Sequence, residues 1–269
     1  MDLTGRTALV TGANRGIGRA LTEALAARPL ACVLAGVRDP DRFEPIAPPP
    51  GGAGEVRPVR LVLGSRASID DGAAGLGEVD VLVNNAGQFV GGLLEEQDTE
   101  AIYAMLQVNL VAVMHLTQRV LPGMLARGRG VVVNNTSIVG YAHMPAVTTY
   151  AASKAGVVGF SEALRRELRG TGVGVMHVVT PGVRTDMLEE TDEQYGRYAD
   201  TSSWDRIEPR EWAEKIAGAI ESGDRILGPG GKTALAKLAS RGPAAVLDAA
   251  AGRMFSRQPR SAKRPAAAR

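Results

Sequence analysis

Residues 7–18 read Thr7-Ala8-Leu9-Val10-Thr11-Gly12-Ala13-Asn14-Arg15-Gly16-Ile17-Gly18, and this stretch decides the fold. A short apolar strand leads into a glycine-rich turn, and a pattern of helical period follows. Gly12 permits a sharp turn, Gly16 lets the backbone approach a pyrophosphate, and Gly18 allows close packing of helix on sheet. The free N–H groups at the start of such a helix favour phosphate. The stretch predicts a nucleotide site at this turn, and a glycine-rich loop without a ligand is the alternative.

Strands and helices alternate along the rest of the chain, which predicts an α/β fold built on one doubly wound parallel sheet with helices on both faces. Strands are expected at 7–10, 31–36, 58–63, 79–83, 130–136, 173–179 and 225–228. Helices are expected near 17–27, 99–126, 148–169 and 210–221. The run Pro48-Pro49-Pro50-Gly51-Gly52 predicts a loop between the second and third strands. Residues 68–77 leave room for only a short helix.

Tyr150 and Lys154 are four residues apart, so they share one face of the helix predicted at 148–169. A phenol titrates near pH ~10 in water, and an ammonium in hydrogen-bonding range lowers that value by ~1–3 units. Such a tyrosine can act as a general acid or base near neutral pH. For this pair taken alone, a packed Tyr and a surface Lys on a half-buried helix is the alternative.

Four further motifs occur in order along the chain. They are Asn84-Asn85-Ala86-Gly87 after an apolar strand, Asn109 in a Val-Asn-Leu run, Ser137 thirteen residues before Tyr150, and Pro181-Gly182 leading to Thr185. Together with Thr11–Gly18, they resemble the short-chain dehydrogenase/reductase family, whose glycine loop is Thr-Gly-x-x-x-Gly-x-Gly. The resemblance covers roughly residues 3–230. It implies a Rossmann-type catalytic domain and hydride transfer between a nicotinamide cofactor and a carbonyl or secondary alcohol.

The resemblance also implies a catalytic set made of Asn109, Ser137, Tyr150 and Lys154. Tyr150 would exchange the proton with the substrate oxygen, Lys154 would lower the pKa of the phenol and bind the nicotinamide ribose, and Ser137 would hold the substrate oxygen. Asn109 would anchor a water that links Lys154 to solvent. Two alternatives stay open: Asn109 as a helix asparagine bonded to backbone, and the neighbouring Thr136 in place of Ser137.

The predicted cofactor residues lie in five segments of the chain. They are Thr11, Gly12, Asn14, Arg15, Gly16, Ile17, Gly18, Arg38, Asn85, Ala86, Gly87, Tyr150, Lys154, Pro181, Gly182, Val183 and Thr185. Arg38 at the end of the second strand and Arg15 in the glycine loop favour the 2′-phosphate of NADP, because a guanidinium binds phosphate through two hydrogen bonds. Asp39 would instead favour the ribose of NAD if the register shifted. Val62 stands where relatives carry an Asp that contacts the adenine.

The substrate side is less defined by the sequence. His143 lies between Ser137 and Tyr150, and Met187 follows Thr185, so both are expected to line the substrate pocket, although a solvated loop histidine is the alternative for His143. Residues 186–210 mix aromatic and charged side chains and are expected to cover the substrate. No metal site is expected, because the three histidines have no ligand partners at a recognised spacing.

Length and composition are consistent with one large α/β domain that has a substantial core. The chain has 269 residues, a formal net charge of +2 and a single cysteine, Cys32, which is expected to pack in the second strand. The basic residues of the first 250 positions are scattered, so no specific nucleic-acid partner is expected. The first strand starts too early for a signal peptide, and no apolar run reaches the ~18 residues of a membrane span, which predicts a cytoplasmic protein.

The C-terminal part departs from the family. Residues 231–251 predict a helical extension that caps the pocket, joins an oligomer interface or lies on a membrane, and residues 252–269 predict a basic, disordered tail. The helices at 99–126 and 148–169 predict a homodimer or homotetramer, because in relatives these helices pair subunits. An NAD-linked alcohol dehydrogenase of the same family and a catalytically silent nucleotide-binding regulator remain as other functions.

Overall fold

The computed structural model describes residues 1–201, 204–228 and 255–256. Its centre is a seven-stranded sheet in the order β3-β2-β1-β4-β5-β6-β7, and every neighbouring pair is parallel. The strands are β1 (Thr7–Thr11), β2 (Cys32–Val37), β3 (Glu55–Arg60), β4 (Val81–Asn84), β5 (Gly130–Ser137), β6 (Val173–Thr180) and β7 (Ile226–Leu227). From β1 the chain continues to β2 on one side, and from β4 it continues to β5 on the other side, so the connections after β1 and β4 lead in opposite directions. In open parallel sheets, a nucleotide binds in the crevice between two such connections. The predicted α/β fold with a doubly wound sheet is confirmed.

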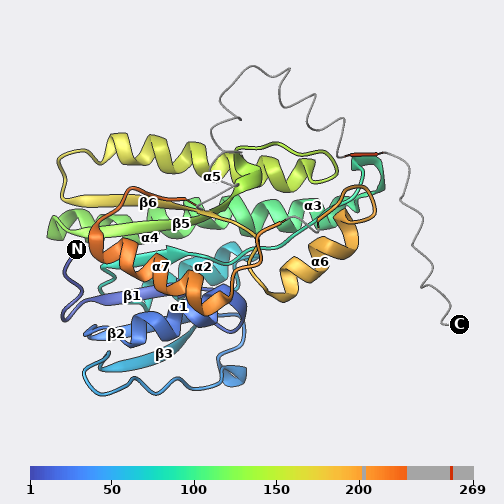
Figure 1. Cartoon of the computed structure of the whole chain (residues 1–269). Helices are drawn as coiled ribbons and strands as arrows, with labels where there is room; N and C mark the ends of the chain where they lie inside the picture. Colours follow the sequence, from blue (N-terminus) through green and yellow to red (C-terminus); the bar gives the residue numbers. More distant parts are fainter. Residues whose placement is uncertain (202–203, 229–254, 257–269) are drawn as a thin grey trace, which may run out of the picture.

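Helices cover both faces of this sheet (Figure 1). The helices are α1 (Gly16–Ala26), α2 (Arg66–Ala74), α3 (Thr99–Leu106), α4 (Ala112–Arg127), α5 (Thr148–Glu167), α6 (Asp186–Tyr195) and α7 (Pro209–Ser222). Short 3₁₀ turns lie at Pro40–Arg42, Leu94–Glu96 and Ile138–Gly140. Helix α6 lies beyond the end of the sheet that is far from the N-terminus (Figure 1).

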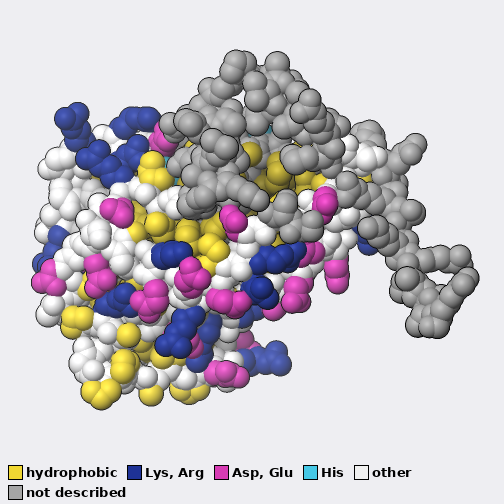
Figure 2. Space-filling model, in the orientation of Figure 1, with side chains coloured by type: hydrophobic (Ala, Val, Ile, Leu, Met, Phe, Trp, Pro, Cys, Tyr) yellow, Lys and Arg dark blue, Asp and Glu magenta, His cyan; other side chains and the backbone are white. Residues whose placement is uncertain are grey.

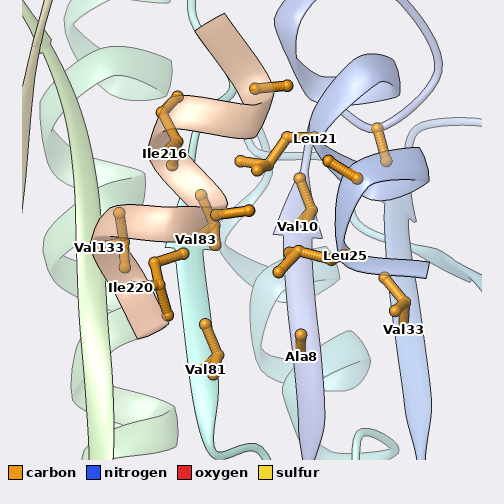
Figure 3. Close-up of a cluster of buried hydrophobic side chains, with 14 of the residues drawn as sticks. Ala8, Val10, Leu21, Leu25, Val33, Val81, Val83, Val133, Ile216 and Ile220 are labelled. Carbon is orange, nitrogen blue, oxygen red and sulfur yellow. The ribbon is translucent and has the colours of Figure 1, made fainter. Parts of the chain in front are cut away.

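Side chains of β1 alternate between the two faces of the sheet, as the period of two in a strand requires. Ala8 and Val10 pack with Leu21 of α1 and Ile216 of α7 on one face (Figure 3). Leu9 packs on the other face with residues of α2 and α4. Both faces are therefore apolar, which is why the strands read as nearly continuous apolar runs.

The third strand is the main error of the sequence prediction. It was expected at 58–63, and it runs from Glu55 to Arg60, because its pairing with β2 begins at Cys32 opposite Glu55 and ends at Val37 opposite Arg60. The strand lies at the edge of the sheet. Pro58 has no backbone N–H group to donate, and an edge strand tolerates this because no further strand pairs with its outer side. The predicted loop at 48–52 is confirmed, since the described segment between the turn at Pro40–Arg42 and β3 contains no helix.

The helix predicted at 99–126 is continuous but not uniform. A π-helical turn, Gln107–Val111, lies between α3 and α4 and contains Asn109. Such turns insert one residue into a helix and occur frequently at functional sites. Sequence periodicity does not reveal this irregularity, because the flanking helices are regular.

The expected boundaries at 230/231 and 251/252 lie outside the described residues, as do almost all residues of the predicted C-terminal extension and tail. Only Phe255 and Ser256 are described there. Phe255 forms an antiparallel bridge with Ala199, and the Ser256 N–H donates to the carbonyl oxygen of Tyr198 at 3.1 Å.

Candidate active site

The glycine turn brings three of the predicted cofactor segments together. A Cβ atom on Gly18 would lie 2.0 Å from the carbonyl oxygen of Gly12 and 2.6 Å from Nδ2 of Asn85, so no side chain fits there. Gly16 has φ +53, and a Cβ atom on it would lie 3.1 Å from Cγ2 of Thr185. The turn after β1, the loop after β4 and the segment after β6 therefore meet at the carboxyl edge of the sheet.

Thr11 joins the first two of these segments. Its Oγ1 accepts hydrogen bonds from the backbone N–H groups of Asn85 (3.0 Å) and Ala86 (3.1 Å) and donates to the carbonyl oxygen of Val83 (3.3 Å). The Asn85 carboxamide donates to the Thr11 carbonyl oxygen at 3.0 Å. These bonds fix the Asn85-Ala86-Gly87 loop against the end of β1.

The segment after β6 contains Pro181, Gly182 and Val183, and it pairs with the chain around Ile207. Val183 forms a parallel bridge with Ile207, and the Ile207 N–H donates to the Gly182 carbonyl oxygen at 3.0 Å. Thr185 then caps α6, because its hydroxyl oxygen accepts from the Leu188 N–H at 3.4 Å. The hydroxyl and methyl of Thr185 thus lie between the glycine turn and α6.

Two of the predicted phosphate ligands are exposed at the open edge of this region. Arg38 directly follows β2, and Asn14 and Arg15 are exposed in the glycine turn. The Arg15 guanidinium forms a salt bridge with Asp186 at 2.8 Å, so it reaches from the glycine turn to the first residue of α6. Asp39 is engaged elsewhere, since its carboxylate accepts from the Asp41 N–H and caps the short turn Pro40–Arg42. The Asp39 carboxylate therefore stabilises the turn that directly follows it.

Ser137, Tyr150 and Lys154 come together at the ends of β5 and α5. Ser137 is the last residue of β5, Tyr150 lies in the first turn of α5, and Lys154 lies one turn later. The Ser137 hydroxyl hydrogen-bonds to the Tyr150 phenol. The Lys154 ammonium lies 5.7 Å from the centre of the Tyr150 ring and donates to the carbonyl oxygen of Asn135 at 3.1 Å. The neighbour Thr136 points elsewhere, because its hydroxyl donates to the carbonyl oxygen of Val178.

The pKa of Tyr150 moves opposite to the sequence prediction. Burial raises the pKa of Tyr150 to about 12, and the hydrogen bond from Ser137 lowers it only in part. Burial also lowers the pKa of Lys154 from 10.5 to about 8, since the low-dielectric interior disfavours the ammonium. The prediction that Lys154 lowers the pKa of Tyr150 is wrong for this structure, because the ammonium is bonded to Asn135 rather than to the phenol.

Asn109 is buried in the π-helical turn, and its carboxamide clamps the backbone of Gln88. Its Oδ1 accepts from the Gln88 N–H at 2.8 Å, and its Nδ2 donates to the Gln88 carbonyl oxygen at 2.9 Å and to the Ser153 hydroxyl at 3.2 Å. This is the backbone-bonded asparagine that the sequence left open as an alternative. The clamp holds the loop after Gly87 against α5, and the water link to Lys154 stays a prediction.

Apolar and aromatic side chains surround the substrate side of Tyr150. The Phe89 ring meets the Tyr150 ring edge to face, with centroids 5.1 Å apart. Tyr195 of α6 is buried and stacks on Trp204 at 5.3 Å, and both belong to the apolar cluster on which Tyr150 packs. Met187 is half-buried, and its methyl group would lie 3.8 Å from a Cβ atom on Gly87. His143 is exposed on the loop before α5, so its pocket role stays a prediction.

Sequence reasoning missed three residues that touch the site. Asn135 receives the Lys154 ammonium, Phe89 contacts Tyr150, and Ser153 bonds to Asn109. Only Asn135 had a usable signal, because a second Asn-Asn pair at the end of an apolar strand repeats the pattern of Asn84-Asn85. Phe89 and Ser153 are brought to the site by folding and carry no pattern of their own. In the described part of the chain, no group of three or more His, Cys, Asp or Glu side chains could hold a metal ion.

Comparisons with known proteins agree with this architecture. The family model described as short chain dehydrogenase matches residues 6–196. The chain is 38% identical over 196 residues to the 3-oxoacyl-[acyl-carrier-protein] reductase FabG of Haemophilus influenzae, covering 71% of this chain and 80% of the relative. It is 37% identical over 204 residues to nodulation protein G of a Rhizobium species, covering 72% and 80% of the two chains.

Among solved structures, the fold is similar to that of a short chain dehydrogenase from Burkholderia cenocepacia in complex with NADP. The TM-score is 0.80 at 26% identity, and the match covers 93% of this chain and 99% of the other. The fold and the glycine turn define a doubly wound, nucleotide-binding class of protein. Within that class, the chain belongs to the short-chain dehydrogenase family, and it is an oxidoreductase.

Proposed function

We propose that the protein is an NADP(H)-dependent oxidoreductase that interconverts a carbonyl group and a secondary alcohol, with Tyr150 as the general acid and base. The observation that carries this proposal is the convergence of Ser137, Tyr150 and Lys154 beside the glycine turn. The Tyr150 phenol is hydrogen-bonded to the Ser137 hydroxyl and lies near the buried Lys154 ammonium, at the edge of the sheet where the nucleotide would bind. Such a phenol can exchange a proton with a substrate oxygen.

The residues of the turn fit a dinucleotide. The backbone around Gly12, Gly16 and Gly18 is free of side chains where a pyrophosphate would approach the start of α1. The Tyr150 and Lys154 side chains and the Asn85-Ala86-Gly87 loop would hold the nicotinamide riboside. When bound, the cofactor would supply or accept the hydride.

NADP rather than NAD is supported by the exposed cations at this edge. Arg38 follows β2, where the 2′-position of the adenine ribose lies in this class of fold, and Arg15 lies in the adjacent turn. Asp39, the residue that would favour NAD, is held by its own cap. The Burkholderia structure to which this chain is similar holds NADP, which agrees with the proposal. NAD(H) remains a weaker alternative cofactor.

The chain's own residues account for the proton transfer. A pKa near 12 keeps the Tyr150 phenol protonated at neutral pH, so it is ready to give a proton to a carbonyl oxygen, and the reverse reaction makes it the base. The Ser137 hydroxyl holds the substrate oxygen and stabilises the phenolate that forms. Lys154, still largely protonated at pH 7, stabilises the same negative charge. The protonated phenol is the form from which the reduction of a carbonyl group starts.

The substrate is a carbonyl compound with some apolar surface, since Phe89 and Tyr195 share an apolar cluster with Tyr150, and Met187 lies beside Gly87. The test is consumption of NADPH and NADH with a panel of ketones, aldehydes, quinones and carrier-bound 3-oxoacyl chains. We expect turnover with NADPH that is lost in Tyr150→Phe. NADPH binding without turnover on any compound would instead support the silent regulator.

The helix face formed by α3 and α4 supports a homodimer or homotetramer. Tyr103 is 69% exposed, and Val111, Met114 and Leu125 are exposed along the same continuous helix. An apolar row of this kind on a monomer marks a protein interface. Met114→Glu should lower the mass seen by light scattering to that of the monomer. Ala126→Glu, at an exposed position about a third of a turn round the same helix, should leave the mass unchanged. A wild-type monomer would contradict this proposal.

A cytoplasmic location is proposed with one correction. By length and composition, the helix Thr99–Arg127 passes the test for a membrane span, so the prediction that no run does so is wrong. Leu116 and Met124 of this helix are fully buried against the sheet, which makes it a covering helix of the domain. On the face shown in Figure 2, basic and acidic side chains are interspersed.

A further inference from the structure

Two neighbouring strands each carry a pair of consecutive asparagines whose side chains point to opposite faces of the sheet. Asn84 ends β4 and Asn85 follows it, whereas Asn134 and Asn135 lie within β5. Asn84 of β4 is opposite Asn134 of β5. On the face covered by α4 and α5, Asn84 donates to the Oδ1 of Asn134 at 2.8 Å, and Asn134 donates to the Ser161 hydroxyl at 2.9 Å. On the other face, Nδ2 of Asn135 donates to Oδ1 of Asn85 at 3.0 Å. The first pair is a structural link within the core, whereas the second lies at the candidate active site.

The second pair belongs to a longer chain of hydrogen bonds. The Trp212 indole N–H donates to Oγ1 of Thr180 at 3.1 Å, and the Thr180 hydroxyl donates to Oδ1 of Asn135. Asn135 donates to Asn85, whose Nδ2 donates to the carbonyl oxygen of Thr11 at 3.0 Å. This chain runs along the carboxyl edge of the sheet from α7 through β6, β5 and the loop after β4 to the end of β1.

The direction of every bond in this chain is set by its two ends. An indole N–H can only donate, and a backbone carbonyl can only accept. Thr180 accepts from Trp212, so its own proton is available for Asn135. Asn85 uses its N–H group on Thr11, so its oxygen must accept from Asn135. The Asn135 carboxamide therefore has one orientation that satisfies both neighbours, and chains aligned in this way strengthen each bond.

Asn135 also holds the lysine of the site. The Lys154 ammonium is 5% exposed and donates to the Asn135 backbone carbonyl oxygen at 3.1 Å. In the described part of the chain, this is the hydrogen bond that fixes the ammonium. One residue thus carries the contact to Lys154 on its backbone and the contacts to the cofactor loop and to Thr180 on its side chain.

We propose that Asn135 is a positioning residue that couples the Asn85 cofactor loop to Lys154 through the chain of hydrogen bonds from Trp212 to Thr11. Its carboxamide keeps the end of β5 and the loop after β4 in the register that places the ammonium beside the phenol. This inference rests on the function proposed for Tyr150 and Lys154, and it adds a residue that acts through them without touching the reacting atoms.

The test compares Asn135→Leu with a matched variant on the same strand, Asn134→Leu, which removes a buried carboxamide on the opposite face. Each variant is first checked for folding by thermal unfolding. We expect Asn135→Leu to lower kcat about tenfold with less than about a twofold change in the KM of the carbonyl substrate. Asn134→Leu should lower the melting temperature while kcat stays within about twofold of the wild type.

A double-variant cycle tests the coupling itself. Thr180→Val should also lower kcat about tenfold, and the double variant Asn135→Leu/Thr180→Val should lose no more than about twofold beyond either single variant, because both break one chain. Losses that multiply to about a hundredfold would overturn the proposal, as would a kcat for Asn135→Leu within twofold of the wild type. An equal loss of kcat in Asn134→Leu would overturn it too, since a general effect on the strand would then suffice.

Two further measurements keep the test decisive. If Asn135→Leu does not fold, Asn135→Asp replaces it, because the carboxylate has nearly the same size, still accepts from Thr180 and cannot donate to Asn85; the same loss of kcat is expected. NADPH affinity, measured by nucleotide fluorescence, needs no turnover and should fall about fivefold in Asn135→Leu and not in Asn134→Leu. If neither Asn135→Leu nor Asn134→Leu changes the NADPH affinity, the proposed link between Asn135 and the cofactor loop is overturned. This result does not depend on turnover, so it can be distinguished from a failure of the proposed function, in which the wild type reduces no compound.

Discussion

Removing the negative charge of Asp186 should strengthen NADPH binding and leave NADH binding unchanged. The Arg15 guanidinium, which we propose as a ligand of the 2′-phosphate, forms its salt bridge with Asp186 at 2.8 Å. A guanidinium that binds the phosphate must give up this contact or share it. The Asp186 carboxylate therefore competes with the cofactor for Arg15, and Asp186→Asn ends the competition.

The expected magnitude follows from exposure. The side chains of Arg15 and Asp186 are 60% and 69% exposed, and exposed ion pairs contribute about 0.2–1 kcal/mol. Asp186→Asn should therefore increase NADPH affinity by at most about fivefold. Arg15→Ala removes a charged hydrogen bond to the phosphate, worth about 1.5–3 kcal/mol, so NADPH affinity should fall about 10- to 150-fold. In the Arg15→Ala background, Asp186→Asn should have less than about a twofold effect, because its target is gone.

The assay is titration of NADPH and NADH fluorescence at two ionic strengths. Glu190→Gln is the matched control, since Glu190 is an exposed acid of the same helix with no salt bridge in the described structure. The gain in Asp186→Asn should shrink at high salt, because exposed pairs are screened. An equal gain for NADH, an equal gain in Glu190→Gln, or a gain that persists without Arg15 would refute the competition. Weaker NADPH binding in Asp186→Asn would show that Asp186 supports the site instead.

Three other predictions follow from buried groups. The pKa of Lys154 is lowered from 10.5 to about 8, so the unfolded chain binds the proton more tightly, and the free energy of unfolding should rise by at most about 3 kcal/mol as pH rises through this window. Urea unfolding at pH 8 and pH 10 should show that rise in the wild type and a smaller one in Lys154→Met. An equal rise in the free energy of unfolding in the two proteins would contradict this prediction. Asn109→Leu leaves the backbone groups of Gln88 without their partner and should lower the melting temperature by about 5–10 °C, against less than about 2 °C for the exposed Gln118→Leu. Cys32 is buried with its pKa raised to about 11, so it should react with a thiol reagent only on unfolding; rapid modification of the native protein would count against this burial.

The sequence was sufficient where function depends on local pattern. The glycine turn, the strand before it and the helix after it are contiguous, and their spacing alone predicts the close packing at Gly18, where a Cβ atom would lie 2.0 Å from the Gly12 carbonyl oxygen. The same holds for Tyr150 and Lys154, whose separation of four residues places them on one helix face. Cys32 was correctly placed in the second strand, because a cysteine in an apolar run packs like its neighbours.

The third strand failed for a physical reason that applies to edge strands in general. Residues 58–63 look more apolar than 55–60, and an apolar run is a good guide where both faces of a strand are buried. β3 pairs with only one neighbour, and Glu55, Arg57 and Arg60 can lie along it because its outer edge meets solvent. Pairing with β2 sets the register of β3. No local pattern in residues 55–63 encodes that pairing.

The charge state of the site depended on tertiary structure in the same way. From the sequence, a neighbouring ammonium should lower the pKa of Tyr150, and the argument is valid at hydrogen-bonding distance. Folding half-buries Tyr150, buries Lys154 and directs the Lys154 ammonium to the carbonyl oxygen of Asn135. Burial therefore dominates both pKa shifts and moves each group toward its neutral form. At neutral pH, the Tyr150 phenol therefore keeps its proton, and Lys154 is largely charged. The burial that the sequence does not reveal thus keeps Tyr150 in the protonated form from which the proposed carbonyl reduction starts.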